Sequence, residues 1–116
     1  MLNYKIMDIN WITMINNAVY AAMDKKLKIT GYFNNIFNYY GFVFEGRYSI
    51  YVYKNSEDVG HKDCIIVNTP SGTLTTNHVL TDREELHLQD LVITIKEHNE
   101  KMALQELNNF INNETT

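Results

Sequence analysis

The sequence has few of the residues that mark several protein classes. It contains one cysteine, Cys64, one proline and five glycines among 116 residues. A lone cysteine excludes an intramolecular disulfide framework, and no glycine-rich phosphate-binding loop is present. No stretch approaches the roughly 20 consecutive apolar residues of a membrane-spanning helix. The apolar residues before Ala22 fall at helical spacing, which is not typical of a signal peptide. We therefore expect one folded domain, residues 1–116, in the cytoplasm and without a membrane partner.

Positive charge is also scarce. Lys and Arg number 10 against 14 Asp and Glu, which gives a formal net charge of −4. A protein that binds duplex nucleic acid must neutralise several phosphates with Lys and Arg, so direct duplex binding is disfavoured. The acidic balance is more compatible with another protein, such as one with a basic nucleic-acid-binding surface. Abundant Asn and Ile beside scarce Gly and Pro are typical of AT-rich genomes, which include those of many phages.

Two helices are predicted at the N-terminal end. Apolar residues recur every three or four positions from about residue 9 to 26, with Asp8 as the candidate N-cap. A shorter pattern of the same period predicts a second helix over about residues 31–40, ended by Gly41. The sequence thus indicates an N-terminal helix pair.

The apolar period changes from about 3.6 to 2 after Gly41. Aromatic and β-branched residues then alternate with polar ones between about residues 42 and 80. The connections between these runs are too short for parallel crossovers. An antiparallel sheet of three to four strands is predicted, and Gly46 and the segment 68–72 are expected to form turns.

A long helix is predicted over about residues 82–112. Thr81 and Glu84 have the spacing of a capping box at its start. Such a helix would be about 46 Å long, whereas a compact domain of this size is about 35 Å across. Two alternatives remain: the helix breaks within residues 96–100, or its end projects and packs on another chain as a homodimer. The expected fold class is α+β.

Catalytic and metal-binding patterns are incomplete. Glu84 and His87 share a helix face as in di-iron proteins, but no second pair accompanies them. His61 and Cys64 provide half of a zinc site, without a matching second half. We therefore expect no metal and no cofactor. A small enzyme that uses Cys64 with a histidine remains a third alternative.

Tyrosines are dense in the predicted sheet. If Tyr48, Ile50 and Val52 face the core, alternation places Ser49, Tyr51 and Tyr53 on the opposite face. That face is either covered by a helix or open as a tyrosine-rich binding surface.

The segment 38–45 resembles the octapeptide of the RNA recognition motif at Tyr40, Gly41, Phe42 and Val43. The family stacks nucleic-acid bases on aromatic residues in the middle of a sheet. The match does not extend to Asn38 or Tyr39, and the order of helices and strands differs. Single-stranded nucleic-acid binding through a tyrosine-rich sheet is therefore kept as the alternative function.

Together these features predict a non-enzymatic protein-binding module. It could act as an inhibitor or regulator from a phage or other mobile element, occupying the surface of a host protein. The candidate interface residues are Tyr48, Tyr51, Tyr53, Glu57, Asp58, Glu84 and Glu85.

Overall fold

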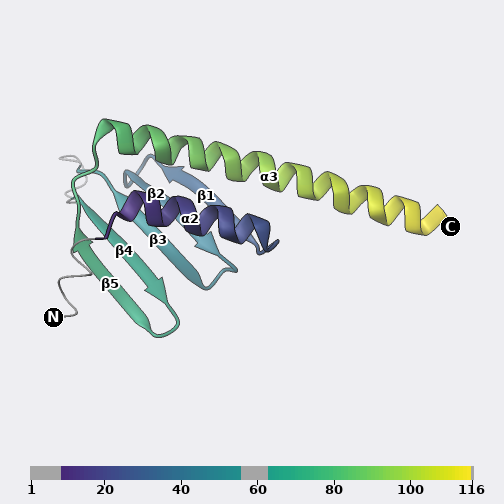
Figure 1. Cartoon of the computed structure of the whole chain (residues 1–116), viewed down its shortest axis with the longest axis horizontal. Helices are drawn as coiled ribbons and strands as arrows, with labels where there is room; N and C mark the ends of the chain where they lie inside the picture. The colour runs from purple at the N-terminus through teal and green to yellow at the C-terminus, as the bar shows by residue number, and fades with distance from the viewer. Residues whose placement is uncertain (1–8, 56–62, 116) are drawn as a thin grey trace.

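The computed structural model describes residues 9–55 and 63–115. The elements are α2 (Trp11–Asp24), β1 (Ile29–Asn34), β2 (Tyr39–Phe44), β3 (Tyr48–Tyr53), β4 (Cys64–Thr69), β5 (Gly72–Asn77) and α3 (Asp82–Thr115). The strands form one sheet in the order β1-β2-β3-β4-β5, and every neighbouring pair is antiparallel. The two helices lie over the same face of this sheet (Figure 1). The expected α+β class and antiparallel sheet are confirmed, with five strands rather than three to four.

The predicted second helix over residues 31–40 is wrong. These residues form β1, a turn and the start of β2. The turn is held by Asn34, whose side-chain oxygen accepts hydrogen bonds from the backbone N–H groups of Ile36 and Phe37. Asn38 then adopts a left-handed φ of 62°, which Asn tolerates better than most residues. The apolar residues at helical spacing belong to a β-hairpin because asparagine turn chemistry interrupts them.

The turn expected at Gly46 is present between β2 and β3. Glu45 and Gly46 have φ values of 54° and 68°, and two consecutive positive values are what a type I′ hairpin turn requires. The N–H of Arg47 closes the turn on the carbonyl of Phe44 at 3.1 Å. The second expected turn joins β4 to β5 between Thr69 and Gly72.

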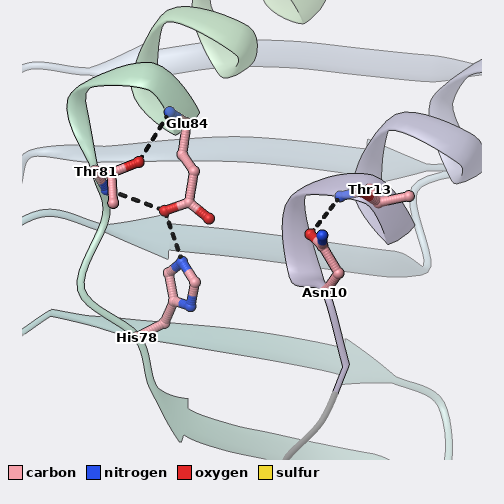
Figure 2. Close-up of polar contacts among 5 residues, drawn as sticks. All are labelled: Asn10, Thr13, His78, Thr81 and Glu84. Carbon is pink, nitrogen blue, oxygen red and sulfur yellow. Dashed lines mark hydrogen bonds and ion pairs between the residues drawn. The ribbon is translucent and has the colours of Figure 1, made fainter.

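Each helix begins at a side-chain cap. Asn10 caps α2 by accepting from the N–H of Thr13 at 3.1 Å, whereas the predicted cap Asp8 lies outside the described residues. The predicted capping box of α3 is confirmed: the N–H of Glu84 donates to Thr81 Oγ1, and the N–H of Thr81 donates to Glu84 Oε1. Figure 2 shows both caps and also His78, whose ring Nε2 lies 3.2 Å from Glu84 Oε1.

Helix α3 is continuous through residues 96–100, so the predicted break is wrong. Its C-terminal end extends past the sheet (Figure 1), and the longest dimension of the molecule is 58 Å. From Ala103 to Asn113 every side chain is exposed, including four large apolar ones, Leu104, Leu107, Phe110 and Ile111. The end of the helix therefore projects, as the second alternative expected, whereas its packing on another chain as a homodimer stays a prediction.

The core lies between the helices and one face of the sheet, here called the inner face. Helix α2 contributes the predicted apolar stripe, and α3 contributes Leu88, Leu91 and Ile95. The central strands supply Tyr40, Phe42, Ile50, Val52 and Ile65. In the described part of the chain, no helix is long and apolar enough to cross a membrane.

Candidate functional site

The opposite face of the sheet, here called the outer face, is the candidate site. Residues alternate between the two faces along each strand, and the core residues fix which set points outward. No described helix packs on the outer face. The outward-facing residues are Thr30, Tyr32, Asn34, Tyr39, Gly41, Val43, Ser49, Tyr51, Tyr53, Cys64, Ile66, Asn68, Thr73, Thr75 and Asn77.

Four tyrosines on β1, β2 and β3 form one cluster on the outer face, here called the tyrosine cluster. Tyr39 is at its centre, with ring centroids 5.9 Å from Tyr32, 5.3 Å from Tyr51 and 4.8 Å from Tyr53. The first two pairs are edge-to-face, the arrangement that aromatic quadrupoles favour. The hydroxyls of Tyr32 and Tyr39 are 3.4 Å apart and hydrogen-bond. Since the rings restrain one another, the cluster presents apolar area and hydroxyls at low entropic cost.

Gly41 makes space for the cluster. It lies opposite Tyr32 on one side and Tyr51 on the other. A Cβ at this position would come within 2.6 Å of the Tyr32 ring, so that ring lies across the glycine. The glycine predicted to end a helix instead sits in the middle of a strand, where only a residue without a side chain leaves room for the ring.

The other half of the outer face is polar and neutral. Asn68 donates to Ser49 Oγ at 3.2 Å and accepts from Thr73 Oγ1 at 2.8 Å. These bonds link β3, β4 and β5 beside the tyrosine cluster. The face therefore combines aromatic rings with hydrogen-bonding groups, and none of these outward-facing residues is charged.

The hydroxyls of Tyr32 and Tyr53 remain protonated over a wide pH range. Burial, together with Tyr39, raises the pKa of Tyr32 well above its ordinary value. Burial and the neighbouring Tyr39 also raise the pKa of Tyr53. At neutral pH these groups act as hydrogen-bond donors and acceptors without adding charge.

Cys64 lies next to Tyr53 on this face and is half-buried. Burial, and then the negative charge of Asp63, raise the pKa of its thiol. A raised pKa reduces the thiolate fraction at neutral pH, whereas a catalytic cysteine needs a lowered one.

The acidic candidates do not join the tyrosine cluster. Glu84 and Glu85 belong to the first turn of α3, on the opposite side of the sheet. Glu85 Oε2 pairs with Lys54 Nζ at 2.8 Å and accepts from the Tyr40 hydroxyl at 2.7 Å. Glu57 and Asp58 lie outside the described residues.

The contacts of Glu84 and Glu85 explain why the pKa of each carboxyl is lowered. Burial by itself raises the pKa of Glu85, but the bonds from Lys54 and Tyr40 outweigh it and lower the pKa. Burial also raises the pKa of Glu84, but the bonds from Thr81 and His78 outweigh it, so the pKa is lowered. Both carboxylates are thus held by contacts within the chain, which leaves them less free to meet a basic partner.

Tyr48 is also separate from the cluster. Its register position at the start of β3 belongs to the inner-face set, as the sequence predicts, and its side chain is 42% exposed. Arg47 lies over its ring, 5.5 Å from the centroid. Of the predicted tyrosines, Tyr51 and Tyr53 therefore share one surface, and Tyr32 joins them because the segment assigned to a helix is a strand.

Glu84 and His87, which the sequence places on one face of a helix, contact different parts of the chain. Glu84 bonds to Thr81 and His78, whereas His87 Nε2 lies 2.9 Å from Asn16 Oδ1 on α2. Among the described residues, no group of three His, Cys, Asp or Glu side chains could hold a metal ion; His61 lies outside them.

Comparison with known proteins gives no assignment. No family model matches the chain, and neither the curated proteins nor the solved structures contain a significant match.

Proposed function

We propose that this chain is a non-enzymatic protein-binding module whose interface is the tyrosine cluster of the outer face. The observation that carries the proposal is a sheet face on which no described helix packs, with four packed tyrosines and no charged side chain among its described residues. Tyrosine is enriched in the centres of protein interfaces, whereas charged residues are depleted there. The partner surface that fits is neutral, with apolar and hydrogen-bonding groups.

Binding of this kind suits an inhibitor or regulator, of phage or mobile-element origin, that covers a host protein's surface. A rigid, pre-packed aromatic surface loses little side-chain entropy on association. The interior contacts of Glu84 and Glu85 shift our proposal away from an electrostatic interface with a basic partner and toward the neutral sheet face.

Single-stranded nucleic acid is the competing partner. Proteins that bind it combine free aromatic faces with a positively charged groove along the backbone. The outer face offers no Lys or Arg among its described residues, and Tyr39 packs against three neighbouring rings. Both features favour the protein partner.

The test is affinity capture from host lysate with and without nuclease, using wild type and a Tyr51→Ala, Tyr53→Ala variant. Tyr20→Ala is the matched control, because this tyrosine is 50% exposed on α2, away from the outer face. We expect a protein that is retained after nuclease treatment and whose affinity falls more than about fivefold in the double variant only. Retention that disappears with nuclease, or equal loss in the control, would contradict the proposal.

A further inference from the structure

The strand β1 forms one edge of the sheet, and its backbone has groups that point away from β2. The N–H of Glu45 donates to the carbonyl of Lys28 at 2.8 Å, so that pair is hydrogen-bonded across the two strands. Hydrogen-bonded and non-hydrogen-bonded pairs alternate along an antiparallel ladder. Following the register, Thr30 and Tyr32 bond to β2, whereas Gly31 and Phe33 direct their N–H and C=O groups outward.

A contact from α3 supports the conclusion that alternate backbone groups of β1 point away from β2. Asn99 Nδ2 donates to the carbonyl of Ile29 at 2.8 Å, and Ile29 has the same parity as Gly31 and Phe33. Helix α3 therefore reaches the outward groups of β1 at one end of the strand. It satisfies the carbonyl of Ile29 and leaves those of Gly31 and Phe33 facing the space beside the strand.

That space is a groove between β1 and α3. One hollow of about 590 Å³ is lined by Gly31, Phe33, Val92, Lys96, Asn99 and Ala103, among others. A second hollow of about 590 Å³ shares Phe33 and Val92 and continues toward Tyr40 and the Lys54–Glu85 pair. The two hollows adjoin at Phe33 and Val92, and volumes of this size are typical of ligand-binding clefts.

We propose that this groove binds an extended peptide segment of another protein, which adds to β1 as a sixth strand. Outward N–H and C=O groups two residues apart on a strand are matched by another extended backbone. Alternate side chains of that peptide enter the groove, whose lining by Phe33, Val92 and Ala103 favours apolar residues there. The groove adjoins the tyrosine cluster at Tyr32, which also lines it, but the proposal does not rest on that cluster.

The opposite edge of the sheet offers a contrast. In β5 the residues from Gly72 to Thr75 are all exposed. An added strand there would gain backbone hydrogen bonds, but neither of the two hollows beside α3 extends to the described residues of β5. On β1 the close seating of α3, where Ile95 contacts Gly31, places a helix wall beside the edge.

The probe is a phage-displayed library of random nine-residue peptides, selected on the full chain. An enriched peptide is then synthesised with a fluorescent label. We expect apolar residues at alternate positions. Every second amide of the bound peptide faces β1, so N-methylation of that set should weaken binding at least about tenfold. N-methylation of the remaining amides, which face away from β1, should change the affinity less than about twofold. Failure to enrich any peptide, or equal sensitivity of both parities, overturns the proposal.

Variants and hydrogen exchange locate the site. Ala103→Arg fills the groove and should weaken the peptide at least about tenfold, whereas Leu104→Arg, one residue along on the same exposed helix, should not. In the free chain the amides of Gly31 and Phe33 should exchange faster than those of Thr30 and Tyr32, and the peptide should protect them. Equal affinity of the two arginine variants for the peptide contradicts a peptide site. Protection of the Gly31 and Phe33 amides in a free chain that self-associates also contradicts it, and assigns the edge of β1 to a second copy of the chain.

Discussion

The seating of α3 on β1 can be tested at Gly31. A Cβ added there would lie 2.6 Å from Ile95 Cδ1, while Ile95 Cβ and Phe42 Cδ1 are both 3.6 Å away. Only the terminal methyl of Ile95 is therefore in conflict. Because Ile95 is 1% exposed, that methyl has little room to move.

The expected energies follow from this geometry. Gly31→Ala overpacks the core, which costs about 1–3 kcal/mol, less the roughly 0.4–1 kcal/mol gained by restricting the unfolded chain. Ile95→Val removes Cδ1 and alone costs about 0.5–1.5 kcal/mol. In the double variant the alanine methyl occupies the space that Cδ1 has left. Its stability should be close to that of Ile95→Val alone, which gives a coupling energy of about 1–2 kcal/mol.

The assay is urea unfolding of the wild type, both single variants and the double variant, followed by circular dichroism. Equal m-values in all four proteins would show that the compactness of the states is unchanged. A double variant whose loss equals the sum of the single losses within about 0.5 kcal/mol would refute the close approach of α3 to β1. It would also remove the helix wall on which the peptide groove depends.

Further predictions concern the tyrosine cluster, the cap region and the end of α3. Gly41→Ala should displace the Tyr32 ring and cost about 1 kcal/mol in urea unfolding, but should be neutral or stabilising in a Tyr32→Ala background; equal effects in both would contradict the ring placement. The pKa of Glu85 is lowered from 4.5, so its contribution to stability is present above that pH and is lost as pH falls through the folded-state value. A Glu85→Gln variant should accordingly show a smaller decline of Tm below pH 4.5, and an unchanged decline would argue against the ion pair. Removal of residues 107–116, whose described side chains are exposed, should change the free energy of unfolding of the dilute chain by less than about 1 kcal/mol, and a larger loss would indicate that this segment packs on a second chain.

The proposed interfaces differ in what they would recognise. The tyrosine cluster is a surface of side chains, so its affinity should respond to Tyr51 and Tyr53. The edge of β1 is a surface of backbone groups, so its affinity should respond to N-methylation of the partner. Loss of one interaction with retention of the other would therefore separate the two proposals experimentally.

Local signals in the sequence determined several elements. The apolar stripe from Trp11 to Ala22 predicted α2, since a helix that packs on a core must repeat its apolar residues at this period. The Thr81 and Glu84 capping box located the start of α3. Alternation in β3 placed Tyr51 and Tyr53 on the face opposite Ile50 and Val52, because side chains on a strand alternate by geometry alone.

Only the tertiary structure decided the rest. The segment 31–40 has apolar spacing compatible with a helix, and pairing with β2 together with the Asn34 turn made it a strand. That pairing brought Tyr32 beside Tyr39 across Gly41 and made β1 the sheet edge that α3 flanks. Whether the tyrosine face is covered also depends on where the helices pack. Contacts between residues far apart in sequence set both the surface and the groove, and the local sequence pattern does not encode them.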